Sequence, residues 1–288
     1  MIRKAVIPAA GFGTRFLPAT KSQPKEMLPI VDTPVIQYVV QEAVDSGITD
    51  ILMIIGKGKH AIEEHFDRSF QLEAQLLEKG KKTELQNIRR ISELADIHFV
   101  WQKEMKGLGD AIYCARHHVQ NEPFVVLLGD TLIDAPTPAA RQLQQLYQQH
   151  RNSVVLVEKL DSSLISRYGV LDAEQIQPRV YLVNDIIEKP TPQQAPSNLA
   201  IAGRYLLTPD IFDYISRTKP ADDGEIQLTE PIRMMAKDRP IYALLLDGKR
   251  CDIGNKEGFI KTNIEFALKR DDMAQNLRKF IKNLAKEF

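Results

Sequence analysis

Residues 4–29 read KAVIPAAGFGTRFLPATKSQPKEMLP. The apolar residues at the start of this stretch predict a β-strand, which the chain leaves through Gly11 and Gly13. Glycine permits backbone dihedrals and close approaches that a Cβ atom forbids, and the prolines that follow disfavour a helix or a sheet strand over the rest of the segment. Three cations are spread along it, namely Arg15, Lys21 and Lys25. A cationic loop that opens on glycines at the end of a strand indicates a site for an anion.

Two common phosphate-binding motifs do not fit this loop. A dinucleotide-binding fingerprint needs a third glycine that lets a helix pack on the strand, but Phe16 stands at that position. A P-loop needs a Gly-Lys-Ser/Thr run that leads into a helix, and no such run follows Gly13. Glycines at such a junction are also common as simple turn residues, so the residues alone leave both an anion site and a structural turn open.

The composition is that of an ordinary globular protein, with 288 residues, 43% hydrophobic and 26% charged. Lys and Arg together number 38, as do Asp and Glu, so no net charge directs the chain toward nucleic acid or an anionic membrane. Cys114 and Cys251 offer neither a disulfide framework nor zinc-ligand spacing, and we expect Cys114 to be a buried thiol. The first apolar run is too short for a signal peptide, and no run approaches the roughly 20 residues that span a bilayer. We therefore expect a soluble, cytoplasmic protein.

Strand and helix patterns alternate along the first half of the chain. Between the first two strands lies a predicted helix that Asp32 or Thr33 can cap, with Pro34 in its first turn and Gly47 after its end. This alternation predicts an α/β fold with a Rossmann-like, mixed but mostly parallel sheet flanked by helices. Ligands of such sheets bind beyond the carboxyl ends of the strands. The predicted strands, each expected to be buried, are 4–7, 51–55, 97–101 and 124–128.

The remaining segments fit one large body with two helical additions. Residues 57–95 are charged and mostly helical in pattern, and we interpret them as a helical excursion used for packing or subunit contact. Residues 256–288 carry two further helical patterns and form a C-terminal appendage. No clear linker separates these parts, so we expect a single domain over 1–288. Further strands are predicted at 154–157, 180–183 and 241–245.

Several short motifs follow one another in a fixed order along nearly the whole chain. They are Ala9–Arg15, Pro18–Lys21, Pro24–Pro29, Ile36–Tyr38, Gln102–Glu104, Lys106–Gly109, Leu128–Asp130, Tyr168–Val170, Glu188–Pro190, Ala195–Ala200, Gly203–Tyr205, Gly224–Thr229 and Asp252–Gly254. These motifs resemble those of bacterial UTP–glucose-1-phosphate uridylyltransferases, which belong to the sugar nucleotidyltransferases, and ordered motifs are far more specific than one glycine loop.

The resemblance implies an enzyme that attacks the α-phosphorus of UTP with an oxygen of glucose-1-phosphate. The products are UDP-glucose and pyrophosphate, and relatives act as homodimers or homotetramers. A thymidylyltransferase that uses dTTP is one alternative, although the Pro24–Pro29 segment argues against it. A non-catalytic regulatory paralogue that binds a sugar nucleotide is the other, and the intact Thr14-Arg15 pair argues against that.

The resemblance also implies roles for individual residues. Arg15, Lys25 and Lys189 are the expected catalytic cations. Glu188 would accept hydrogen bonds from glucose hydroxyls while Lys189 holds the sugar phosphate. The nucleotide-binding set is Ala9, Ala10, Gly11, Gly13, Thr14, Glu26, Gln102 and Gly107, and the sugar-phosphate set is Gly169, Glu188, Lys189 and Gly203.

A metal site is expected from the same comparison. Asp130 directly follows an apolar strand and a glycine, a position where aspartate is also common as a turn residue. Mg²⁺ prefers hard oxygen ligands and keeps substrate phosphates among them, so the resemblance favours Asp130 as a Mg²⁺ ligand, with Asp252 as a second candidate.

Three residues depart from the family pattern. Asp110 stands where relatives commonly carry histidine, Cys251 where tyrosine is common and Thr33 where lysine is common. Asp110 is close in sequence to the expected base pocket, so nucleotide affinity or selectivity could differ. None of the three removes an expected catalytic group.

Overall fold

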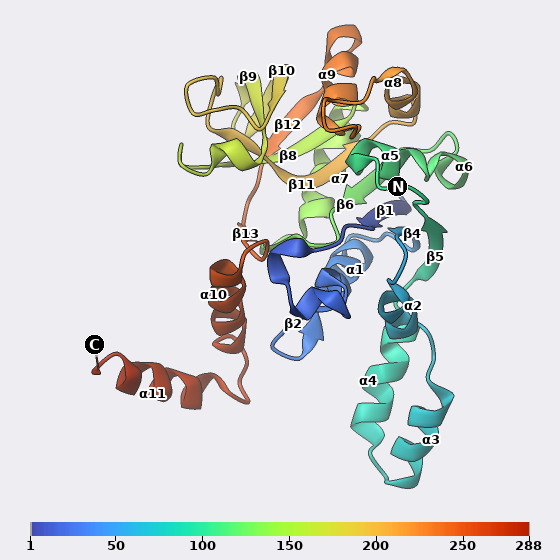
Figure 1. Ribbon diagram of the computed structural model, residues 1–288, viewed down its shortest axis with the longest axis vertical. Coiled ribbons are helices and arrows are strands. Elements are labelled where there is room, and N and C mark those ends of the chain that lie inside the picture. Colours follow the sequence, from blue (N-terminus) through green and yellow to red (C-terminus); the bar gives the residue numbers. More distant parts are fainter. Residues whose placement is uncertain (1, 288) are drawn as a thin grey trace.

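The computed structural model describes residues 2–287 and is built on one nine-stranded sheet (Figure 1). Only β11 and β10 run against the direction of the other strands, so the predicted mixed, mostly parallel sheet is confirmed. In order across the sheet, the strands are β5 (Asp96–Trp101), β4 (Asp50–Ile55), β1 (Lys4–Ala9), β6 (Phe124–Leu127), β11 (Leu199–Leu207), β8 (Val154–Lys159), β12 (Tyr242–Leu245), β10 (Val180–Glu188) and β9 (Gly169–Gln177).

Helices cover both faces of the sheet, because successive side chains of each central strand point to opposite faces. In β1, Val6 belongs to one apolar core and Ile7 to the other. The Val6 face is covered by α5 (Gly107–Tyr113), α6 (Arg116–Val119), α8 (Ile211–Arg217) and α9 (Thr229–Asp238). The Ile7 face is covered by α1 (Val35–Asp45), α2 (His60–Phe66) and α7 (Ala139–His150).

The predicted helix after the first strand is present as α1, but its start differs from the prediction. Pro34 occupies the N-cap position and no side chain caps the helix. Asp32 and Thr33 instead lie at the turn between two short strands, β2 (Pro29–Ile30) and β3 (Thr33–Pro34). The prediction of a side-chain cap was therefore wrong, because this hairpin takes up the polar residues before the helix. Gly47 follows the helix with a φ of 82°, as expected of a glycine beyond a C-cap.

Other local predictions also need correction. β5 is the edge strand, and Trp101 at its end is 45% exposed, so this strand is not buried. Cys114 is half-buried at the end of α5, whereas Cys251 is the buried thiol. The proline-rich part of the opening loop is not free of regular structure. It forms β2 and the short 3₁₀ turns η1 (Thr14–Phe16), η2 (Ala19–Lys21) and η3 (Lys25–Met27).

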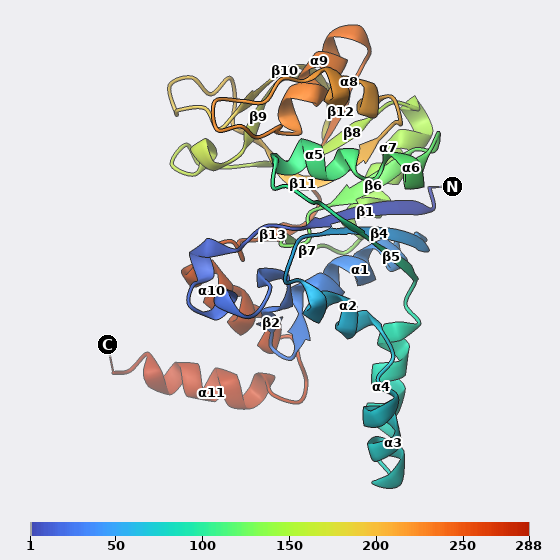
Figure 2. The ribbon, with the colours of Figure 1, turned by 45° about the vertical axis from the view of Figure 1, so that its right-hand side comes forward.

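The excursion at 57–95 contains α2 and two further helices, α3 (Phe70–Glu78) and α4 (Lys82–Ser92). Both ribbon views show α3 and α4 extending away from the sheet as a pair (Figures 1 and 2). The predicted helical excursion is therefore present.

Before the C-terminal helices, β13 (Lys249–Cys251) pairs with β7 (Leu132–Asp134) in a separate two-stranded sheet. After β13 come α10 (Lys256–Ala267) and α11 (Ala274–Leu284). The α10 residues Phe259 and Phe266 pack on a small third core around Ile30 and Ile253. α11 lies at the periphery in both ribbon views (Figures 1 and 2). Within residues 2–287, no helix has both the length and the apolar character needed to cross a bilayer.

Candidate active site

Three adjoining cavities of about 300, 270 and 230 Å³ lie where the parallel strands β5, β4, β1 and β6 end. Asp130 is in the wall of all three, so they form one cleft around its carboxylate. β1 and β6 are neighbours in the sheet, and the Gly129 N–H donates to the Pro8 carbonyl over 3.3 Å. The opening loop after β1 and the Asp130 turn after β6 therefore meet at the same edge of the sheet.

The glycine at 13 is required by the course of the opening loop. Gly13 has a φ of 68°, a left-handed conformation that favours glycine, and a Cβ atom there would lie 2.9 Å from Cβ of Lys25. The Thr20 hydroxyl donates to the Gly13 carbonyl over 2.8 Å and closes the loop. The loop thus bends tightly enough to place Lys25 beside the glycines. Thr14 and Arg15 follow in η1 and line the first cavity.

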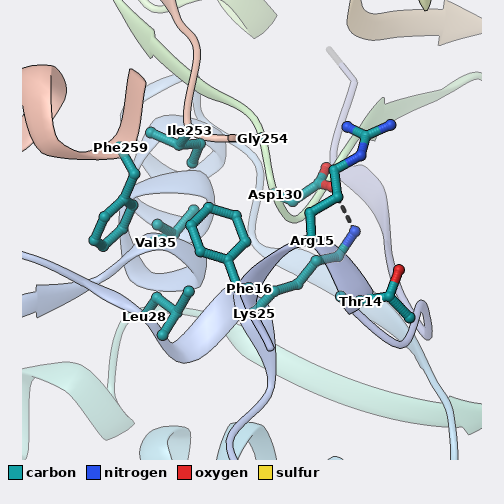
Figure 3. Close-up of a pocket in the computed structure, with 11 residues that line it drawn as sticks. Thr14, Arg15, Phe16, Lys25, Leu28, Val35, Asp130, Ile253, Gly254 and Phe259 are labelled. Atoms are coloured by element: carbon teal, nitrogen blue, oxygen red, sulfur yellow. Dashed lines mark hydrogen bonds and ion pairs between the residues drawn. The ribbon is translucent and has the colours of Figure 1, made fainter. Parts of the chain in front are cut away.

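Lys25 and Asp130 form an ion pair at the centre of the cleft, with 2.5 Å between Nζ and Oδ2 (Figure 3). Burial alone would lower the pKa of Lys25, but Asp130 and Glu26 raise it above 10.5. Burial would likewise raise the pKa of Asp130, but Lys25 lowers it below 3.8. Both groups therefore carry charge at neutral pH, one cation and one anion side by side.

Arg15 adds a second cation next to this pair. It lines both the first and the third cavity, and Figure 3 shows it close to Lys25 and Asp130. Lys21, by contrast, is exposed in η2 and lines none of the three cavities. Of the three loop cations, the structure brings Arg15 and Lys25 to the cleft and leaves Lys21 outside.

The second cavity contains most of the predicted base-binding residues. Ala10, Gly11, Gln102 and Gly107 line it, and Gln102 reaches it because it directly follows β5. The Gln102 Nε2 group donates to the Gly107 carbonyl over 3.1 Å and to Asp110 Oδ2 over 2.8 Å. Asp110, the departure noted in the sequence, is thus in direct contact with Gln102.

The side chains of two predicted nucleotide-binding residues, Ala9 and Glu26, are buried in the protein. The Ala9 side chain packs in the Ile7-side core. Glu26 is in the wall of the second cavity, but its carboxylate is buried against Lys59, with 2.8 Å between Oε2 and Nζ. Burial raises the pKa of Glu26, and Lys59 opposes this rise.

The third cavity holds the second metal candidate. Asp252 lines it together with Asp130 and Arg15. Asp252 Oδ1 accepts from the Gly254 N–H over 3.2 Å, and its Oδ2 accepts from Asn255 Nδ2 over 2.6 Å. In residues 2–287, no group of three or more His, Cys, Asp or Glu side chains could hold a metal ion. A cation here would thus need further oxygen ligands from a bound substrate.

The predicted sugar-phosphate residues fall into two places. Glu188 lines a further cavity of about 510 Å³, whose wall includes Glu225, and Glu225 also lines the second cavity. Lys189 is 55% exposed and its Nζ lies 3.3 Å from Glu188 Oε1. Gly169 is adjacent, since a Cβ atom on it would lie 3.3 Å from Glu188 Oε2. Gly203 instead is buried at a bulge in β11, against Thr131 and Leu128.

Supporting residues were not identified by the sequence reasoning. Lys59 donates to the Gly11 carbonyl over 2.7 Å and so ties the glycine loop to Glu26. Thr229 Oγ1 lies 2.5 Å from Glu188 Oε2 and orients that carboxylate. Arg204, which is fully buried, pairs with Glu42 and donates to the Thr131 carbonyl over 2.8 Å. The motifs containing Thr229 and Arg204 were the only signal for them, and Lys59 had none.

Comparisons with known proteins agree with this arrangement. The family model for nucleotidyl transferases matches residues 4–268. The UTP–glucose-1-phosphate uridylyltransferase of Staphylococcus haemolyticus is 52% identical over 283 residues, which cover 98% of each chain. A solved UDP-glucose pyrophosphorylase in complex with UDP-glucose is 44% identical with a TM-score of 0.86, covering 94% of this chain and all of that one. A UTP-bound UDP-glucose pyrophosphorylase from Acinetobacter baumannii is 36% identical with a TM-score of 0.91, covering 99% of this chain and 100% of the other. Because the matches extend over almost the entire chain and include the cleft, this protein belongs to the nucleotidyl transferases and, within them, to the UTP–glucose-1-phosphate uridylyltransferase family.

Proposed function

We propose that this protein transfers the uridylyl group of UTP to glucose-1-phosphate and forms UDP-glucose and pyrophosphate. The observation that carries the proposal is the cleft around Asp130, where Lys25, Arg15, the glycine loop and Gln102 converge. A cationic loop beside a carboxylate suits a triphosphate, and the amide of Gln102 suits the edge of a base.

The reaction is an in-line substitution at the α-phosphorus. A phosphate oxygen of glucose-1-phosphate forms a bond to that phosphorus, and the bond to the β-phosphate oxygen breaks. The attacking oxygen is already ionised at neutral pH, so no general base is required. Such transfers depend mainly on positioning and on stabilising the negative charge of the transition state.

The cations of the opening loop supply this stabilisation. Lys25 would contact the α-phosphate, and Arg15, whose planar fork suits two oxygens at once, would contact the leaving pyrophosphate. Backbone N–H groups of Gly11, Gly13 and Thr14 would add hydrogen bonds to the phosphates. Gln102, Gly107 and the Ala10–Gly11 backbone would hold the base, with Glu26 and Lys59 as a buried support behind them.

We propose that Mg²⁺ is the cofactor and that Asp130 and Asp252 are its protein ligands. The donor set fits, since two carboxylates line one cavity and Mg²⁺ takes few protein oxygens besides substrate phosphates and water. When bound, the ion would neutralise charge on the phosphate oxygens. Asp130 also pairs with Lys25, with 2.5 Å between Oδ2 and Nζ.

The sugar phosphate would bind along Glu188, Lys189 and Gly169. Lys189 has a φ of 45°, a left-handed conformation that is costly for a residue with a side chain. Such strain is common where a side chain must be held in one direction. Gly203 supports the Asp130 turn from behind, so we place it outside the contact surface for the sugar.

The proposal includes a cytoplasmic homo-oligomer, either a dimer or a tetramer. Both cysteines are free thiols, which supports a reducing compartment. Large apolar side chains are exposed on α3 and α11, and such exposure suits contacts between subunits. These side chains are Phe70, Leu72, Leu77, Phe280 and Leu284. Light scattering coupled to size-exclusion chromatography measures the oligomeric state, and a monomer would contradict this part of the proposal.

The test is pyrophosphate release with glucose-1-phosphate, Mg²⁺ and each nucleoside triphosphate in turn. We expect the highest rate with UTP and a lower one with dTTP, since one methyl group changes discrimination by only about 1–3 kcal/mol. Asp130→Ala should abolish release. Faster turnover with dTTP would identify a thymidylyltransferase, and binding of UDP-glucose without any release would identify a regulatory paralogue.

A further inference from the structure

The amide of Gln102 is held from one side only. The side chain is 5% exposed and lines the second cavity. Its Nε2 group donates one hydrogen bond to the Gly107 carbonyl over 3.1 Å and one to Asp110 Oδ2 over 2.8 Å. Within residues 2–287, no group donates a hydrogen bond to its Oε1 oxygen.

The chemistry of these partners fixes the direction of the amide. A glutamine amide has two N–H donors on one atom and an acceptor on the other. A backbone carbonyl and an ionised aspartate are acceptors only, so the NH₂ group must face Gly107 and Asp110. A flipped amide would place its oxygen against two acceptors and lose both hydrogen bonds. Both donors are therefore committed, and only an acceptor remains for a ligand.

The elements around Asp110 make this direction rigid. Asp110 lies in the first turn of α5, and the backbone of Ile226 is hydrogen-bonded to the start of this helix. The Gly109 N–H donates to the Ile226 carbonyl over 2.7 Å, and the Ile226 N–H donates to the Lys106 carbonyl over 2.8 Å. A Cβ atom on Gly109 would lie 2.8 Å from Ile226, so this turn has no room to shift. The carboxylate of Asp110 consequently stays within reach of Gln102.

A Gln102 amide that offers only an acceptor distinguishes uracil from cytosine where it faces the ring N3 atom. The ring N3 atom of uracil carries a hydrogen and can donate, whereas N3 of cytosine has a lone pair. We propose that Asp110 is a specificity-determining residue, which fixes the acceptor of Gln102 toward the ligand and so favours UTP over CTP. The inference rests on the proposed function, because it assumes that the nucleotide base binds in the second cavity.

The experiment compares UTP and CTP affinities by isothermal titration calorimetry in the wild type and in Asp110→Asn. Asparagine keeps the shape of the side chain but can donate to Gln102 Oε1, so only the Gly107 carbonyl still holds the amide in its wild-type direction. We expect the wild type to prefer UTP by at least about 100-fold and Asp110→Asn to lose about tenfold of that preference, mainly through tighter CTP binding. An unchanged ratio of the two affinities would overturn the inference.

A double-mutant cycle separates this role from a merely structural one. In a Gln102→Ala background, Asp110→Asn should leave the ratio of UTP to CTP affinity unchanged within about twofold, because the amide through which it acts is gone. An equal loss of preference in both backgrounds would contradict the role of Gln102 as intermediary. If the wild type binds UTP and releases pyrophosphate but the ratio never moves, only this inference fails. If the wild type binds no UTP, the proposed function fails with it.

Discussion

Lys25 has the environment expected of a residue that stabilises charge during the reaction. It contacts Asp130 at 2.5 Å and lies next to Arg15 in the cleft (Figure 3). We predict that Lys25→Ala lowers kcat by about 10²–10³, the usual cost of removing one preorganised donor. The matched control is Lys21→Ala, because Lys21 belongs to the same loop but is exposed. Its kcat should stay within about twofold of wild type, and equal losses in the two variants would contradict the assignment.

Lys189 should act on the sugar phosphate and not on the nucleotide. Its ammonium group lies beside Glu188 rather than beside Lys25 and Asp130. Lys189→Ala should therefore raise the KM for glucose-1-phosphate and lower kcat, while the Kd for UTP measured by calorimetry stays within about twofold. Lys159, exposed at the end of β8, provides a control lysine whose loss should change neither value. If Lys189→Ala weakened the binding of UTP as much as that of glucose-1-phosphate, the result would contradict this role.

The sequence predicted the charged residues of the cleft but not the residues that support them. The glycines, prolines and strand end indicated an anion site but left a structural turn open, and the resemblance of the motifs that contain Arg15, Lys25 and Asp130 led to their assignment. Lys59 could not be predicted, since it sits in a short charged stretch that looks solvent-exposed, and only the folded chain buries it against Gly11 and Glu26. The contact of Asp110 with Gln102 likewise depends on how α5 meets β5.

Among the elements, α1 and β11 are joined by a buried ion pair that supports the Asp130 turn. Arg204 on β11 is fully buried, pairs with Glu42 of α1 at 2.8 Å, and donates to the carbonyls of Leu128 and Thr131. We predict that Arg204→Met lowers the free energy of unfolding by about 3–5 kcal/mol, since it leaves the largely buried Glu42 carboxylate without its cation. Urea unfolding measures this loss.

A matched double variant tests the reason for that loss. Arg204→Met combined with Glu42→Met removes both charges, so it should recover much of the stability that the single variant loses. Pyrophosphate release should stay low in both, because neither holds the carbonyls on either side of Asp130. A loss below about 1 kcal/mol in the single variant would contradict the proposed support, being no more than the effect of a surface pair.

The helix pair α3–α4 should loosen in acid. Hydrogen bonds from Arg68 and then Arg89 lower the pKa of Glu73 from 4.5 to about 2. Because the folded pKa is depressed, the stabilisation is complete above pH 4.5 and disappears as the pH falls toward 2. Hydrogen exchange across α3 and α4 should therefore speed up over this range in the wild type.

Glu73→Gln should show the faster exchange already at neutral pH. Glu78→Gln is the control, because Glu78 is exposed and forms no ion pair among residues 2–287. Exchange that is equally fast in the two variants would show that the pairing with Arg68 and Arg89 does not hold the helices together.

A strand could be predicted from the sequence when its residues form a continuous apolar run. The strands β1, β4 and β6 were found because each is an uninterrupted apolar run. β11 was missed, although all nine of its residues are buried, because Gly203 and Arg204 interrupt the run with a bulge and an internal charge. β9 was missed because much of it is exposed at the far edge of the sheet, where burial imposes no clear pattern.

Over the whole molecule, the two cores lie on opposite faces of one continuous sheet. We therefore propose that 1–288 is a single domain, since neither core can lose its packing without exposing strands that the other core shares. Unfolding in urea should then give coincident transitions by far-UV circular dichroism and by the fluorescence of Trp101. Two separated transitions would show that the chain contains two independent units.

We propose that UTP and glucose-1-phosphate react in the cleft around Asp130. The most direct measurement is ³¹P NMR of the purified protein with these two substrates and Mg²⁺. We expect the three UTP resonances and the single sugar-phosphate resonance to disappear together, giving the two resonances of UDP-glucose and one of pyrophosphate. Persistence of the UTP signals, or release of inorganic phosphate with UDP instead of pyrophosphate, would contradict it.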